Sequence, residues 1–196
     1  FLNFDIVLET QWSIYFFFIV FLLVFFASVS DNVTIGGSIG NVFRNAPNVI
    51  TTYSIIMTLF GLLFAAAFFN SSALRDHKNN FQEIIFSKPI NKFGYFIGKF
   101  SASLLLSTIP ITAVFFAVII GSKTAPLMGW IEPERYGPLY FKTFVSNYFI
   151  FILPNMFIGG AIIYSLAQLF KNTTVSFVGA MLILVGYSIA GELISD

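Results

Sequence analysis

The sequence predicts an all-α, polytopic membrane protein, and three observations carry this prediction. Of the 196 residues, 57% are hydrophobic and only 10% are charged, whereas an ordinary soluble domain has about 25% charged residues. Phenylalanine alone occurs 27 times. The apolar residues also gather in long runs. A soluble fold of this size would leave too much of that apolar surface in water, so the composition excludes a soluble enzyme and a disordered chain.

The apolar runs have the length of membrane-spanning helices, which need about 20 mostly apolar residues. Five predicted spans cover residues 12–29, 49–69, 93–120, 144–170 and 174–194. Runs such as Phe16-Phe17-Phe18 lack the alternation of a barrel strand, and lipid offers the backbone no hydrogen-bond partner, so each span is expected to be helical. Pro110 and Pro154 interrupt the third and fourth spans, where we expect kinks rather than breaks.

The charged residues lie mostly between the spans and favour one orientation. Lys and Arg collect on the cytoplasmic side of a membrane. With the N-terminus inside, the inner segments contain Arg75, Lys78, Lys88, Lys92, Lys99 and Lys171, and the outer segments contain only Arg44, Lys123, Arg135 and Lys142. We therefore expect a cytoplasmic N-terminus. The net charge of +1 gives no field to attract nucleic acid.

No catalytic or metal-binding residues are predicted in this chain. The sequence has no cysteine and one histidine, His77, which excludes thiolate sites and a histidine-rich metal site. The motif Gly121-Ser-Lys-Thr lacks the spacing of a phosphate-binding loop. We therefore expect that the chain is not itself an enzyme.

A short amphipathic helix is predicted over about residues 76–87. Phe81, Ile84 and Ile85 share one helical face, and Pro89 ends the pattern. This helix is too short to cross a bilayer, so it either connects two spans or docks a cytoplasmic partner. The next span opens with Gly94 and Gly98, a small-xxx-small spacing that lets helices approach closely.

Four sequence segments together resemble type-2 ATP-binding-cassette (ABC) permeases. They are Asn45-Ala-Pro47, the stretch from Arg75-Asp76 through Glu83–Ile90 to Gly98-Lys99, the stretch Met128–Pro138, and Leu153-Pro-Asn155. In this order they are similar to a bacterial subgroup in which the permease is fused to a gluzincin-type aminopeptidase domain. The zinc motif of that domain needs two histidines, so the peptidase is not in this chain.

The resemblance implies a coupling helix that docks on a separate cytoplasmic ATPase subunit, which would bind ATP and Mg²⁺. The implied docking residues are Arg75, Asp76, Phe81, Gln82, Glu83 and Phe86. It further implies a six-span permease half, of which five spans are present, a second permease half or a homodimer, and a place in the bacterial inner membrane. Two residues of the predicted outer loop are candidate site residues, namely Trp130, whose side chain suits the membrane interface, and Arg135.

Two features depart from the family pattern or from a complete chain. The family's N-terminal elbow is usually basic, whereas residues 1–11 carry Asp5 and Glu9. Residue 1 is Phe rather than Met, and the number of spans is odd. We therefore expect residues 1–196 to be a single transmembrane domain within a longer chain.

The function that this resemblance implies is ATP-driven transport, and the family mostly exports its substrates. A largely apolar and aromatic pathway suits a lipid-like or amphipathic substrate, or a mechanical role, better than a small ion. One alternative is a membrane anchor for a fused or associated peptidase domain. A second alternative is an ion-coupled carrier, which is disfavoured because no charged residue lies near the middle of a predicted span.

Overall fold

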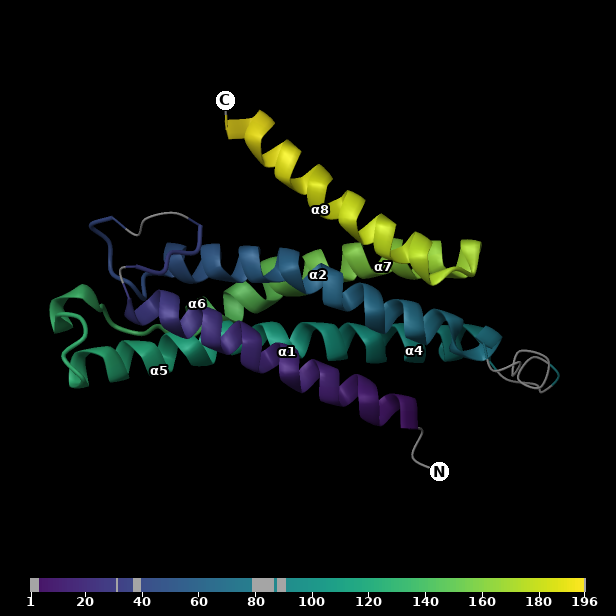
Figure 1. The fold of residues 1–196 in the computed structure, drawn as a ribbon, viewed down its shortest axis with the longest axis horizontal. Helices are drawn as coiled ribbons and strands as arrows, with labels where there is room; N and C mark the ends of the chain where they lie inside the picture. Colours follow the sequence, from purple (N-terminus) through teal and green to yellow (C-terminus); the bar gives the residue numbers. More distant parts are fainter. Residues whose placement is uncertain (1–3, 31, 37–39, 79–86, 88–90, 196) are drawn as a thin grey trace. The chain divides into compact units, whose positions relative to one another are not determined.

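The protein is an all-helical, multi-pass membrane protein. The computed structural model describes residues 4–30, 32–36, 40–78, 87 and 91–195, and the side chains of these residues except 4–8, 187, 188 and 190–195. All regular secondary structure in these ranges is helical (Figure 1). Four stretches are long and apolar enough to cross a membrane, namely Glu9–Val29, Pro47–Lys78, Lys92–Leu127 and Phe141–Phe170. Each of these stretches contains one of the first four predicted spans.

The first two spans are single helices, α1 (Phe4–Val29) and α2 (Pro47–Lys78). Pro47 begins α2, where its missing N–H group would have no helical partner in any case. The last turn of α2 carries Arg75 and Lys78, whose positive charge suits the negative end of the helix dipole. α2 thus ends at Lys78, nine residues after the end of the predicted span at residue 69.

The third and fourth spans change helical type near their prolines. The third consists of α4 (Lys92–Thr108), the 3₁₀ segment η1 (Ile109–Thr112) and α5 (Ala113–Leu127). The fourth consists of α6 (Phe141–Asn147), the π-helical segment η3 (Tyr148–Ile152) and α7 (Leu153–Phe170). Proline lacks a backbone donor and displaces the carbonyl four residues before it, which accounts for irregular turns at these places. The kinks themselves stay a prediction.

The fifth predicted span, residues 174–194, corresponds to α8 (Thr173–Ser195). Its apolar part with described side chains, Thr173–Gly186, is shorter than a span. A membrane-crossing role for α8 therefore stays a prediction.

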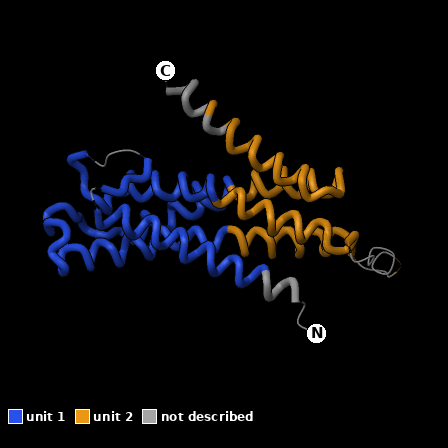
Figure 2. The backbone as a smooth tube through the Cα atoms, in the orientation of Figure 1, with its two compact units in different colours: residues 1–60, 108–155 blue, residues 61–107, 156–196 orange. Residues whose placement is uncertain are grey.

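The chain forms two compact units, which Figure 2 colours separately. Unit 1 comprises residues 1–60 and 108–155, and unit 2 comprises residues 61–107 and 156–196. The expectation of a single transmembrane domain over residues 1–196 is not tested by this division.

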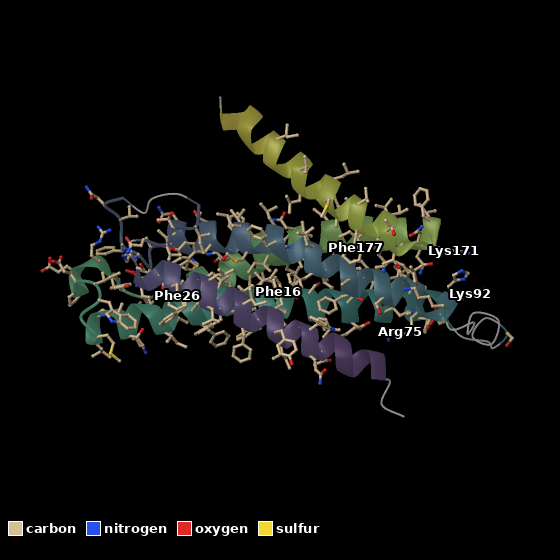
Figure 3. All side chains as sticks on the ribbon, viewed as in Figure 1. Phe16, Phe26, Arg75, Lys92, Lys171 and Phe177 are labelled. Atoms are coloured by element: carbon tan, nitrogen blue, oxygen red, sulfur yellow. The ribbon has the colours of Figure 1, made fainter. Side chains whose placement is uncertain are left out.

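In unit 1, α1 packs along α5 through small side chains (Figure 1). Every fourth residue of α5 on the packed face is small and buried: Ala113, Ala117, Gly121 and Ala125. A Cβ atom at Gly121 would overlap the side chain of Ser28. Between Ile14 and Ala27, α1 carries only apolar and aromatic side chains on all its sides. Phe16 is buried, whereas Phe26 is 52% exposed (Figure 3). A helix that is apolar all round is typical of a membrane span, with its outer face toward lipid.

Unit 1 also contains a buried arginine, Arg44, which is 1% exposed. Its Nη1 donates to the backbone carbonyls of Ala27 (3.4 Å), Ser28 (3.5 Å) and Ser30 (3.0 Å). These carbonyls lie at the C-terminal end of α1, where helical partners are missing. The Arg44 backbone N–H donates to the carbonyl of Arg135 at 2.9 Å. Arg44 therefore joins the end of α1 to a distant loop.

The core of unit 2 is aromatic. The Phe100 ring on α4 lies 5.2 Å from the ring of Phe69 on α2 and 5.9 Å from that of Tyr164 on α7, measured between centroids. A Cβ atom at Gly160 on α7 would overlap the ring of Phe69, which is fully buried. By contrast, a Cβ atom at Gly98 would have no other described atom within 4 Å.

The predicted packing role of Gly94 and Gly98 is thus not used within the described part of the chain. The nearest atoms to a Cβ at Gly94 belong to Asn91, 3.6 Å away. Close approach of a further helix at this pair stays a prediction.

The same substitution is expected to have opposite effects at two glycines of unit 2. Gly160→Ala should destabilise the protein by about 1–3 kcal/mol, because the buried Phe69 ring has no space to move into. Gly98→Ala should be neutral or stabilising by up to about 1 kcal/mol, because alanine has the higher helix propensity. Thermal unfolding in detergent, followed by tryptophan fluorescence, measures both. Equal losses of stability at the two positions would contradict the packing described for α7.

Candidate functional site

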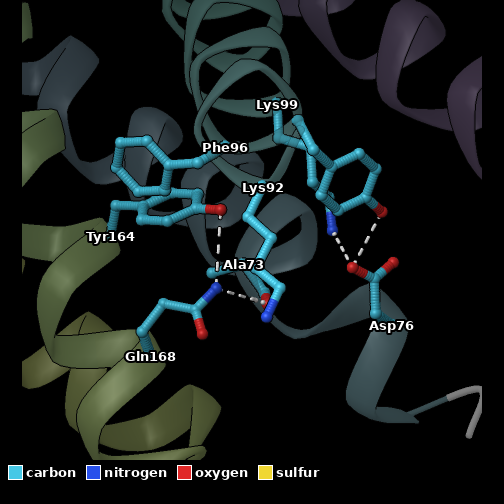
Figure 4. A pocket seen from close by; sticks show the side chains of 8 residues that line it. Ala73, Asp76, Lys92, Phe96, Lys99, Tyr164 and Gln168 are labelled. Carbon is cyan, nitrogen blue, oxygen red and sulfur yellow. Dashed lines mark hydrogen bonds and ion pairs between the residues drawn. The ribbon is translucent and has the colours of Figure 1, made fainter. Parts of the chain in front are cut away.

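A polar cluster joins the ends of α2 and α4 in unit 2. The ammonium group of Lys99 lies 2.8 Å from Oδ2 of Asp76, and the hydroxyl of Tyr95 donates to the same oxygen at 2.8 Å (Figure 4). Lys99 also lies 5.1 Å from the centroid of the Tyr95 ring. We call these three residues the Asp76 cluster.

The local sequence explains how the cluster forms. Tyr95 and Lys99 are four residues apart on α4, so they share one face of the helix. Asp76 lies in the last turn of α2. The Lys99 and Asp76 side chains are only 15% and 16% exposed, and a charge-assisted hydrogen bond is stronger in such a setting than in water. A further bond runs from the Ser72 hydroxyl to the Lys99 carbonyl at 3.2 Å.

A third helix joins the same end of unit 2. Nε2 of Gln168 on α7 donates to the carbonyl of Ala73 at 3.1 Å and to the hydroxyl of Tyr164 at 3.4 Å. The Lys78 ammonium donates to the hydroxyl of Thr173, at the start of α8, at 3.4 Å. The ends of α2, α4 and α7 are therefore cross-linked by side chains.

A cavity of about 330 Å³ opens between these helix ends. Its walls include Asp76, Lys92, Phe96, Tyr164 and Gln168. Within the described ranges, no group of three or more His, Asp or Glu side chains is placed to hold a metal ion. Charge pairing and hydrogen bonding are the interactions that the cluster itself provides.

The structure places only part of the predicted docking element. Arg75 and Asp76 lie in the last turn of α2. Phe81, Gln82, Glu83 and Phe86, with most of the predicted helix over 76–87, lie outside the described residues.

The other predicted loop residues belong to unit 1. Trp130 is 58% exposed. Arg135 ends the 3₁₀ segment η2 (Pro133–Arg135), and its Nη2 donates to the carbonyl of Gly40 at 3.1 Å. Trp130 and Arg135 belong to unit 1, whereas the Asp76 cluster belongs to unit 2.

Sequence reasoning missed the roles of Gln168 and Tyr164. One signal was present, since Gln168 is an isolated amide inside an apolar run, and a polar side chain within a membrane-spanning helix favours a polar partner. The identity of that partner, a backbone carbonyl 95 positions away in the chain, leaves no trace in the local sequence.

The ion pair should be measurable by a double-mutant cycle. Asp76→Asn and Lys99→Gln should each lower the thermal stability, and the double variant should lose less than the sum, with a coupling of about 1 kcal/mol. Asp76→Asn combined with Lys123→Gln, a change in the other unit, serves as the control and should be additive. A coupling of zero between Asp76 and Lys99 would show that the pair does not hold the two helices together.

No family model, curated protein or solved structure matches the chain. The long apolar helices indicate a multi-pass membrane protein, and side chains cross-link the ends of α2, α4 and α7.

Proposed function

We propose that the chain is the transmembrane permease subunit of an ATP-driven ABC transporter that exports a lipid-like substrate. ATP and Mg²⁺ would bind to a separate cytoplasmic ATPase subunit, and a second permease half or a second copy of this chain would complete the pathway. In this proposal the protein lies in a bacterial inner membrane, with its N-terminus in the cytoplasm.

The observation that carries the proposal is the position of the Asp76 cluster. Residues 79–90 lie between α2 and α4 in the sequence, and the cluster links these two helices to each other. A force applied to residues 79–90 would thus act on both helices together instead of separating their ends. Movement of packed helices as rigid bodies is a common way to convert a local event into a change of state.

The surroundings of the cluster support this role. Gln168 extends the linkage to α7 through the carbonyl of Ala73. The core beneath is formed by aromatic rings such as Phe69 and Phe100, which resist compression because protein interiors are close-packed. An apolar and aromatic interior also suits a lipid-like substrate better than an ion.

The test is co-purification of an ATPase with the full-length protein, extracted in mild detergent from its native membranes. Phe81→Asp should reduce the bound ATPase by about tenfold or more, as expected for loss of an aromatic anchor at a docking surface. The resemblance includes Asp76 among the docking residues, but its carboxylate contacts Lys99 and Tyr95 within unit 2. Asp76→Asn should therefore retain most of the ATPase and lower the stimulation of its activity. Phe141→Asp, at a phenylalanine that is 78% exposed in unit 1, is the matched control and should change neither.

Two results would contradict the proposal. One is the absence of any ATPase from the purified wild-type protein. The other is an ATPase whose binding and activity are the same in wild type, Phe81→Asp and Asp76→Asn, which would favour a membrane anchor without transport.

A further inference from the structure

We propose that a hollow in unit 1 binds the headgroup of an anionic phospholipid that carries a free hydroxyl group, which is the chemistry of phosphatidylglycerol. The hollow has a volume of about 390 Å³, and its walls include Thr51 of α2, Lys142, Thr143, Ser146 and Asn147 of α6, and Phe151. We call it the Asn147 hollow. The inference does not depend on the proposed transport function, because it concerns a lipid held at the surface of one unit.

The wall of the hollow contains a buried acceptor that lacks a donor. Asn147 is 3% exposed. Its Nδ2 donates to the carbonyl of Thr143 at 3.0 Å, whereas its Oδ1 accepts no hydrogen bond from the part of the chain that the structure describes. A buried polar atom without a partner is unfavourable. A ligand that brings a hydroxyl group into the hollow would supply the missing donor.

The same wall offers donors for a phosphate. Lys142 is exposed, and neither its ammonium group nor the hydroxyl of Ser146 is joined to another described residue by a hydrogen bond or an ion pair. The described lining contains no acidic side chain. A phosphate oxygen could therefore accept a charge-assisted hydrogen bond from Lys142. An ammonium headgroup, as in phosphatidylethanolamine, would instead bring a second positive charge close to this lysine.

The position of the hollow selects a lipid over a soluble anion. The hollow lies where two membrane-spanning stretches begin, Pro47–Lys78 and Phe141–Phe170. Lys142 stands at the start of the second stretch, whereas Phe151 lies further along it. The polar part of the wall is thus at the level of the headgroups, and an apolar side chain lies toward the hydrocarbon core. This order matches the two ends of a phospholipid.

The experiment compares phosphatidylglycerol with phosphatidylmethanol of identical acyl chains, bound to the full-length protein in an uncharged detergent. The two lipids carry the same phosphodiester charge, but only phosphatidylglycerol has hydroxyl groups in its headgroup. Native mass spectrometry measures the amount of each lipid that remains bound. Wild type should retain phosphatidylglycerol about fivefold better, which is the effect expected of one additional hydrogen bond.

Two variants separate the roles of the amide and the lysine. Asn147→Leu should abolish the preference for phosphatidylglycerol, because it removes the acceptor for the headgroup hydroxyl. Lys142→Gln should weaken the retention of both lipids by about fivefold and leave their ratio unchanged, because it removes the partner of the phosphate that both lipids share. The ratio is measured within one variant, so it does not depend on the fraction of protein that folds.

The matched control is Lys123→Gln, which removes another exposed lysine of unit 1 and should change neither the retention nor the ratio. Three results would overturn the proposal: equal retention of the two lipids by wild type, an unchanged preference in Asn147→Leu, or equal losses in Lys142→Gln and Lys123→Gln. Displacement of the bound phosphatidylglycerol by glycerol 3-phosphate would show that the hollow takes a soluble phosphate ester and would overturn its assignment to a lipid.

Discussion

The structure depends on one constraint, which is that lipid cannot satisfy the hydrogen-bonding groups of the backbone. Arg44 shows how the chain meets it. The guanidinium group donates to carbonyls at the end of α1, and the hydroxyls of Tyr53 and Tyr136 donate to two of the same carbonyls. The backbone N–H of Arg44 also donates a hydrogen bond to the carbonyl of Arg135. A buried charge is tolerated here because it replaces the missing helical donors.

The same constraint shapes the interrupted spans and the Asp76 cluster. At η1, the Thr112 hydroxyl donates to the carbonyl of Ile109 at 2.6 Å, beside a proline that cannot donate. At the end of unit 2, a carboxylate and an ammonium group, both largely shielded from water, neutralise each other. Breaking such a pair leaves an uncompensated charge. The cluster therefore holds α2 and α4 together. The proposed function requires such a link, because the two helices would have to move together.

The sequence predicted the helices well because apolar runs report directly on spanning length. It predicted the ends less well, since α2 continues to Lys78 through polar residues that favour no particular boundary. Gly94 and Gly98 carried the expected packing motif, yet the close contacts described in the structure occur at other glycines, among them Gly121 and Gly160. Small residues mark where approach is possible, and only the tertiary arrangement decides where it occurs. The bonds from Arg44 to the end of α1 and from Gln168 to Ala73 could not be predicted, because their acceptors are backbone carbonyls far away in the sequence.

The proposed function requires that ATP hydrolysis in a separate subunit moves the helices of this protein. The sequence contains no cysteine, so Trp130→Cys introduces one thiol at an exposed position in the loop between α5 and α6. The measurement is the rate of thiol labelling in native membranes with and without ATP. A transporter subunit predicts a rate that changes several-fold with ATP and becomes insensitive to ATP in an Asp76→Asn background. A rate independent of ATP in the otherwise wild-type protein would contradict the claim.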